Sequence, residues 1–203
     1  MPSHRGPAND LGEHIARIAA QLFYSEGIHK TGVDRVAAEA NVSKRTLYRY
    51  YSSKEDLVAA ALRRSSLLRF PTDGLPADRI RGAFEALVTF TRTETFRGCP
   101  YINAAAELTD VRHPGREVVV KITTRRREWF EARVAEAGVA NSEGLAEQLD
   151  VLFDGALANA SKRNIETPAT AALAAAQTLV AAALMQKRTT HRSRTRQNMR
   201  IVR

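Results

Sequence analysis

Apolar residues recur at helical spacing along almost the whole chain, and this pattern constrains the fold more than any other feature of the sequence. Leu11, Ile15, Ile18 and Leu22 follow one another at intervals of four, three and four residues, which places them on one face of a helix. The one β-branched run, at residues 118–120, lies inside a charged stretch, so strand signals are nearly absent. We therefore expect an all-α protein of about nine helices.

The seven prolines divide this helical pattern into segments. None lies between residues 8 and 70 or between 115 and 167, whereas Pro71 and Pro76 interrupt the chain after its first third. We expect the later helices at about 33–40, 44–50, 54–69, from 77, 101–109, 114–138, 142–160 and 168–186. The predicted organisation is a first domain at residues 8–68, a second at 77–186, and a tail at 187–203.

Composition excludes several classes of protein. Hydrophobic residues make up 44% of the 203 residues and charged residues 26%, which is ordinary for a globular chain and excludes a wholly disordered one. The single cysteine, Cys99, excludes an intrachain disulfide and a CxxC knuckle, and the five histidines lack metal-ligand spacing. Neither a signal-peptide core nor an uncharged apolar run of about eighteen residues is present. We expect a soluble, cytoplasmic protein without metal, cofactor or membrane partner.

The net charge of +9 is concentrated at the two ends of the chain. Residues 1–70 carry 11 basic and 7 acidic residues, residues 71–186 carry 13 and 15, and residues 187–203 carry 7 and none. A basic first third on a nearly neutral body favours a nucleic-acid-binding domain attached to a domain with another role. The tail has almost no large apolar residues, so we expect it to be disordered and to add salt-sensitive, non-specific DNA affinity.

Residues 32–51 are typical of a helix, a tight turn and a second helix. Asn41 lies where the chain must turn, and asparagine tolerates the left-handed conformation. Ser43 is a good N-cap for the second helix, and Leu47 and Tyr51, four residues apart, both face inward. The outward side then carries Lys44, Arg45, Thr46, Tyr48 and Arg49, whose donors and flat side chains suit phosphates and base edges.

This stretch resembles the tetracycline-repressor (TetR) family of bacterial transcriptional regulators. The family pattern is roughly T-T-V-x-x-I-A-x-x-A-G-V-S-x-x-T-L-Y-x-Y-F-x-S-K-E-x-L, and the resemblance covers about residues 8–68. The matching residues are Thr31, Val33, Ala37, Ala40, Val42, Ser43, Thr46, Leu47, Tyr48, Tyr50, Ser53, Lys54, Glu55 and Leu57. The chain departs mildly at Gly32, Val36, Asn41 and Tyr51. The resemblance implies an N-terminal three-helix DNA-binding domain and a C-terminal helical domain that binds an inducer and dimerises.

The predicted DNA-binding residues come from the helix-turn-helix and the helix that follows it. They are Thr31, Ser43, Lys44, Arg45, Thr46, Tyr48, Tyr50 and Lys54. Arg45 is the first candidate for reading bases, because arginine bridges guanine O6 and N7, and Lys44 is the second. Lys54 and Thr31 begin helices, whose free N–H groups favour phosphate.

The resemblance also implies an inducer pocket in the second domain, with no catalytic residue. The predicted ligand-binding residues are Phe84, Leu87, Phe90, Thr91, Tyr101, Asn103 and Trp129. A near-neutral body indicates a small, largely apolar or aromatic inducer. Arg125, Arg126 and Arg127 are expected on a solvated helix face, and helices 142–160 and 168–186 are expected to form a four-helix bundle with a second copy.

The predicted function is therefore a ligand-responsive repressor that binds a pseudo-palindromic DNA operator as a homodimer. An enzyme is not expected, because the acidic residues are spread out and no glycine-rich phosphate loop is present. Two alternatives remain open: an architectural protein that coats DNA without an inducer, and a transcriptional activator.

Overall fold

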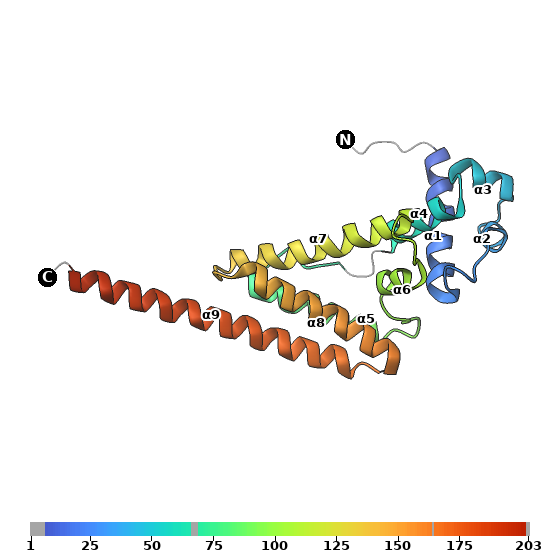
Figure 1. The fold of residues 1–203 in the computed structure, drawn as a ribbon. Coiled ribbons are helices and arrows are strands. Elements are labelled where there is room, and N and C mark those ends of the chain that lie inside the picture. Colours follow the sequence, from blue (N-terminus) through green and yellow to red (C-terminus); the bar gives the residue numbers. More distant parts are fainter. Residues whose placement is uncertain (1–6, 66–68, 164, 202–203) are drawn as a thin grey trace. The chain divides into compact units, whose positions relative to one another are not determined.

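The computed structural model describes residues 7–65, 69–163 and 165–201, and gives only the backbone for residues 7–9 and 187–201. Over these residues the chain forms nine helices and no strand, which confirms the all-α prediction (Figure 1). The helices are α1 (Pro7–Glu26), α2 (Val33–Glu39), α3 (Lys44–Tyr50), α4 (Lys54–Arg64), α5 (Pro76–Thr91), α6 (Pro100–Glu107), α7 (Pro114–Glu136), α8 (Ser142–Arg163) and α9 (Thr167–Ile201).

The helix ends follow from local chemistry. Pro76, Pro100 and Pro114 each begin a helix, where the missing N–H of proline has no intrahelical acceptor to lose. Gly27 and Gly138 follow α1 and α7 with φ of 97° and 76°, a left-handed conformation that glycine adopts without strain.

The chain divides into two compact units. The first contains α1–α4, α6 and α7 as far as Thr123, and the second contains α5, the rest of α7, α8 and α9. The first unit is thus larger than the domain predicted at residues 8–68, because α6 and the loop before it also belong to it.

Hydrogen bonds between residues far apart in sequence hold α6 in the first unit. The Tyr24 hydroxyl donates to the Gly98 carbonyl at 3.0 Å and accepts from the Arg97 N–H at 2.7 Å. The Tyr101 hydroxyl donates to the Ser65 carbonyl at 3.0 Å, at the end of α4. At the other end of α6, the His29 N–H donates to the Glu107 carboxylate at 2.8 Å. These bonds fasten α6 to α1, to the turn after α1, and to α4.

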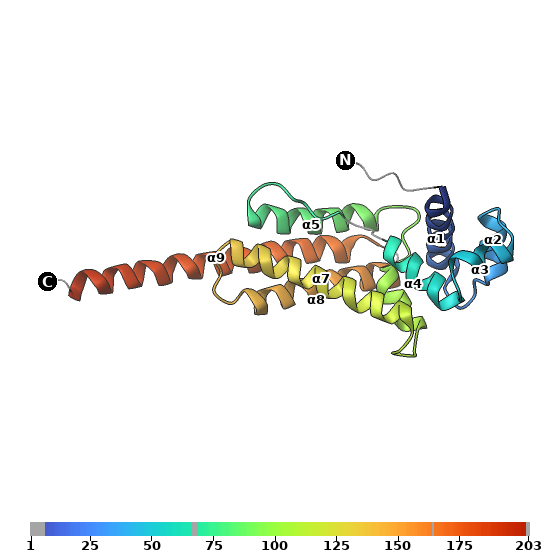
Figure 2. The ribbon, with the colours of Figure 1, turned by 90° about the horizontal axis from the view of Figure 1, so that it is seen from above.

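The second unit has an aromatic interior between packed helices. Helices α5, α8 and α9 contact one another in pairs and run alongside each other (Figure 2). The Phe84 ring of α5 lies 5.8 Å from that of Phe130 and 5.6 Å from that of Phe153, centroid to centroid, and all three side chains are buried. The Phe70 ring, in the segment before α5, lies 4.7 Å from that of Trp129.

Arg126 corrects the expectation that residues 125–127 form a solvated face. Its side chain is 8% exposed; Nε lies 2.6 Å from Asp150 Oδ1, and Nη1 lies 2.8 Å from Asp154 Oδ1. Its guanidinium stands 5.0 Å from the ring centroid of Phe153. Burial lowers the pKa of Arg126, but the hydrogen bond to Asp150 and the ion pair with Asp154 raise it by more, so the net shift is upward. One arginine of the run is therefore a buried cation paired with two carboxylates.

Helix α9 also differs from expectation, since its backbone stays helical to Ile201 where the sequence predicted a disordered tail from residue 187. Residues 187–201 contain no proline or glycine, and extending an existing helix avoids the cost of nucleation. The apolar part, Thr167–Gln186, has a mean hydropathy of 1.5 and is long enough to cross a bilayer. Here it packs against α5 and α8 and buries Ala169, Ala176 and Val180, so its composition is weak evidence for a membrane span.

Candidate nucleic-acid interface

The turn between α2 and α3 is built by two backbone hydrogen bonds and one left-handed residue. Asn41 has φ of 54°, which confirms the conformation predicted for it. Its N–H donates to Ala38 O at 3.1 Å, and the N–H of Val42 donates to Ala37 O at 3.0 Å. This pair of bonds is the Schellman pattern, which ends α2 sharply and lets α3 begin three residues later.

Helix α3 is fixed at its start and on its inner side. The Ser43 Oγ accepts the Thr46 N–H at 3.0 Å, as the N-cap prediction required. Leu47 is fully buried, and the hydroxyl of Tyr51 donates to the Gly12 carbonyl of α1 at 2.7 Å. These contacts hold the opposite side of the helix toward solvent.

The outward side of α3 carries the groups suited to DNA. Lys44, Arg45, Tyr48 and Arg49 are all exposed, and Tyr48 keeps 42% of its surface accessible. The first two lie at the N-terminal end of the helix, the part of a recognition helix that reaches base edges. The structure thus brings together the predicted base-reading residues on one exposed surface.

Three predicted DNA contacts have their polar groups engaged within the protein. Thr31 is fully buried and its hydroxyl donates to the Gly27 carbonyl at 2.8 Å, so its side chain positions the start of α2; this corrects its predicted role at phosphate. The Ser43 and Thr46 hydroxyl oxygens lie 2.8 Å apart and bond to each other, although Ser43 is exposed.

The two remaining residues lie at the edge of this surface. Tyr50 is half-buried against α1, where a Cβ on Gly12 would lie 3.0 Å from its Cδ1 atom. Lys54 is half-buried at the first position of α4, whose N-cap Ser53 accepts the Asp56 N–H at 3.1 Å. Both positions leave room for a phosphate contact, which stays a prediction.

Five of the predicted ligand-binding residues belong to the second unit. Phe84 and Leu87 are fully buried in its core, while Phe90 and Trp129 are half-buried. The Phe90 ring lies 5.2 Å from that of Phe96. Thr91 donates its hydroxyl to the Val88 carbonyl at 2.9 Å. These residues form part of the packed interior, and a ligand role for them stays a prediction.

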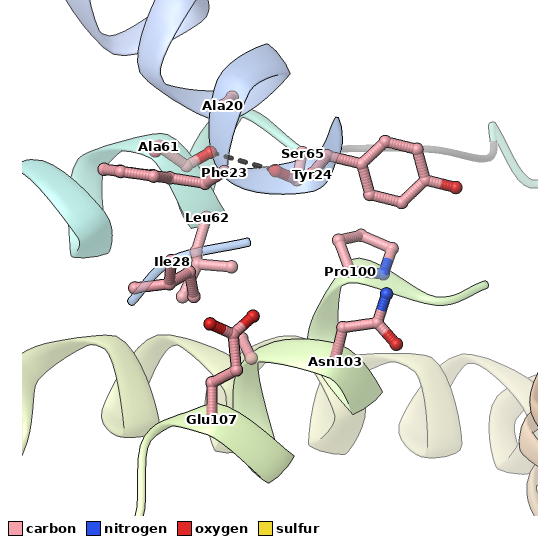
Figure 3. Close-up of a pocket in the computed structure, with 11 residues that line it drawn as sticks. Ala20, Phe23, Tyr24, Ile28, Ala61, Leu62, Ser65, Pro100, Asn103 and Glu107 are labelled. Atoms are coloured by element: carbon pink, nitrogen blue, oxygen red, sulfur yellow. Dashed lines mark hydrogen bonds between the residues drawn. The ribbon is translucent and has the colours of Figure 1, made fainter. Parts of the chain in front are cut away.

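The other two, Tyr101 and Asn103, belong to the first unit. Tyr101 bonds to Ser65 as described above, and the Asn103 amide donates to the Arg97 carbonyl at 2.9 Å. Asn103 and Glu107 also line a pocket between α1, α4 and α6 (Figure 3). Its volume of about 20 Å³ has room for about one water molecule and is too small for an inducer.

Sequence reasoning missed two features that bear on this surface. Asp34, in the first turn of α2, pairs with Lys44 at 3.0 Å, and the hydrogen bond to this carboxylate raises the pKa of Lys44. Asp34 and Lys44 are ten residues apart and lie on different helices, so helical periodicity could not predict their contact. The bond between His29 and Glu107 joins residues still further apart and leaves no local signal. Over the described residues, no cluster of His, Cys, Asp and Glu fits a metal ion.

Comparisons with known proteins agree with this geometry. The model of bacterial regulatory proteins of the TetR family matches residues 15–61, which span α1 to α4. A TetR-type transcriptional regulator from Streptomyces avermitilis is 30% identical, with a TM-score of 0.70 over 82% of this chain and 97% of that one. A TetR-family regulator from Streptomyces coelicolor is 28% identical, with a TM-score of 0.75 over 88% and 96%.

A third relative is the transcriptional activator FasR of Mycolicibacterium smegmatis, 33% identical over 96 residues, or 43% of each chain. Regulators of this kind bind DNA through the helix-turn-helix and are not enzymes, which agrees with the exposed basic side of α3. The chain belongs to the TetR family of transcriptional regulators.

Proposed function

We propose that this protein is a cytoplasmic, ligand-responsive repressor that binds a pseudo-palindromic operator as a homodimer and is released by a small, largely apolar inducer. The observation that carries the proposal is the start of α3, where Lys44 and Arg45 are exposed while Leu47 anchors the helix. Arginine and lysine in this position can read guanine in the major groove, and so select one DNA sequence over others.

An apolar groove between α8 and α9 supports dimerisation. It has a volume of about 690 Å³, and its lining includes Val151 and Leu152 of α8 and Leu179 of α9. Val151 is 62% exposed and lines the groove together with Leu152 and Leu179, and a contiguous apolar surface of this kind often marks a protein–protein interface. A second copy of this chain that uses the same groove would form a four-helix bundle with two-fold symmetry.

The groove includes only part of the apolar stripe on α8. Leu145, Leu149, Leu152, Ala156 and Ala160 form one helical stripe on α8, and all of them except Leu152 are buried within the subunit. The face proposed for a partner includes Leu152 of that stripe and the neighbouring residues Gln148 and Val151. The helical period was therefore correct, but the buried stripe serves the subunit's own core.

A test of the dimer uses Val151→Glu, which should give monomers in sedimentation equilibrium because a carboxylate would be desolvated at the centre of the bundle. Val120→Glu is a matched control, since Val120 is 58% exposed on α7, and it should remain dimeric. A dimer that survives Val151→Glu with unchanged affinity would place the interface elsewhere.

The inducer is proposed to be apolar because aromatic rings fill the described interior of the second unit, where the buried Arg126 is already paired with Asp150 and Asp154. Phe70, Phe84, Trp129, Phe130 and Phe153 lie within 6.0 Å of at least one neighbouring ring, centroid to centroid. An inducer can shift the protein toward a non-binding state only by its differential affinity for the two states, typically about 1–3 kcal/mol of coupling. Trp129 is the only tryptophan, so its emission reports on this region.

Footprinting tests the function as a whole. We expect a short protected region with two half-sites about 34–36 Å apart, one for each recognition helix of the dimer. An inducer should remove the footprint and change Trp129 emission. A continuous, sequence-independent footprint would instead favour the DNA-coating alternative.

The relative FasR is a transcriptional activator, so the alternative that this protein is an activator stays open. Transcription of a reporter with the selected operator, with and without the protein, gives the sign of regulation. A repressor lowers the transcript level, and an activator raises it.

A further inference from the structure

A negatively charged side chain lies next to the basic end of the recognition helix. Asp34 is the second residue of α2, and its carboxylate lies 3.0 Å from the ammonium of Lys44, the first residue of α3. The side chains are 77% and 54% exposed, respectively. Both groups are therefore accessible to a DNA backbone that approaches this surface.

The ion pair has little to do with folding. Exposed pairs between flexible side chains add little to stability, and the α2–α3 turn is already fixed by Asn41, Val42 and the Ser43 cap. Asp34 gains something from the positive end of α2, but any acidic residue in the first turn would do so. The position of Asp34 beside Lys44 thus calls for an explanation at the DNA surface.

A carboxylate at this place changes how Lys44 interacts with DNA. To neutralise a DNA phosphate, the Lys44 ammonium must either break its ion pair with Asp34 or divide its charge between Asp34 and the phosphate. Lys44 therefore releases fewer counterions from DNA than an unpaired lysine does. Binding to an acceptor atom of a base differs from binding to a phosphate, because the Lys44 ammonium has three N–H donors. It can donate one to guanine while another stays on Asp34. The pair therefore weakens phosphate binding more than base recognition.

We propose that Asp34 is a specificity-determining residue, which holds Lys44 away from phosphates and leaves it available to base edges at the operator. The inference rests on the proposed docking of α3 in the major groove. The hydrogen bond to Asp34 raises the pKa of Lys44, so the ammonium stays charged while it is paired with Asp34.

The same helix supplies a matched control. Arg35 of α2 pairs with Glu39 at 2.6 Å and with Glu26 at 3.2 Å, and both pairs are separate from Lys44. Glu39→Gln removes one negative charge from α2, as Asp34→Asn does, but leaves the Asp34–Lys44 pair intact. The difference between the two variants isolates the pair from the change in net charge.

The experiment measures the dissociation constant of each variant over a range of salt concentrations, for a mixed-sequence duplex and for the operator selected with the wild-type protein. Asp34→Asn should tighten binding to the mixed duplex several-fold and steepen the salt slope by about 0.9 per subunit, one further phosphate. Operator affinity should change less, so the ratio of the two affinities falls. Glu39→Gln should produce a smaller gain, alike on both duplexes.

A second background decides whether Lys44 carries the effect. In Lys44→Ala protein, Asp34→Asn should behave like Glu39→Gln. Equal effects of the two carboxylate variants in the wild-type background, or an Asp34 effect that survives Lys44→Ala, would overturn the proposal. If the wild-type protein selects no sequence at all, the proposed function fails, whereas the mixed-duplex slopes still test the coupling between Asp34 and Lys44.

Discussion

The segment from α2 to α3 and the interior of the second unit are organised in opposite ways. In the first, contacts between near neighbours in sequence set the turn and the cap, and the important side chains point to solvent. In the second, Phe84, Arg126 and Phe153 meet from three different helices, α5, α7 and α8, and each pair of these residues is more than twenty-five positions apart in sequence. A helix-turn-helix can therefore be encoded in a short stretch of chain, while the second unit depends on contacts between distant residues.

Loss of the buried cation in the second unit should have the greatest effect on stability. Arg126→Met would leave Asp150 and Asp154 without their buried cation, and removing one partner of a buried pair costs about 3–5 kcal/mol. Urea unfolding should show this loss. The neighbouring exposed residue gives the control, since Arg125→Met should stay within about 0.5 kcal/mol of the wild type. Equal, small losses for both variants would mean that Arg126 is not a structural centre of the second unit.

A smaller effect is expected where a long-range contact occurs inside the first unit. Tyr24→Phe removes the hydroxyl that bonds to both Arg97 and Gly98, and the free energy of unfolding should fall by about 1 kcal/mol. Tyr48→Phe, on the exposed side of α3, is the control and should leave stability unchanged. If Tyr24→Phe is equally neutral, α6 is not fastened to the DNA-binding helices through this tyrosine.

A single phosphate contact at the edge of the α3 surface should have the weakest effect, and Lys54 is the residue that tests it. Lys54→Ala should lower the slope of log K against log salt by about one per subunit and weaken binding to all sequences alike, since a phosphate contact carries no base information. Its unfolding curve should not move. An altered base preference in this variant would show that Lys54 reaches further into the groove than its place at the start of α4 suggests.

The successes of sequence-based prediction in this chain are local ones. Asn41 and Ser43 were identified correctly because turn and cap preferences act within a few residues. Helical periodicity likewise revealed α8 and α9, but it could not say which face meets the subunit's own core and which is left for a partner. The buried position of Ala156 shows this limit.

The misses share a physical cause as well. The sequence around Thr31 does not show that its hydroxyl is already bonded to Gly27, nor does the run at residues 125–127 show which arginine turns inward. Arg126 is buried because Asp150 and Asp154 lie opposite it on α8, and that proximity exists only after folding. The inclusion of α6 in the first unit depends in the same way on Tyr24 and Glu107, each bonded to a residue more than seventy positions away.

We propose that the start of α3 reads DNA sequence through Arg45. Selection of bound duplexes from a random pool, carried out in parallel with wild-type protein and with Arg45→Ala, tests it directly. We expect a two-fold symmetric consensus for the wild type. For the variant we expect a loss of about 1–3 kcal/mol on that consensus, with relaxed preference at one base pair per half-site. An identical consensus for both proteins, with affinity lowered uniformly in the variant, would contradict it.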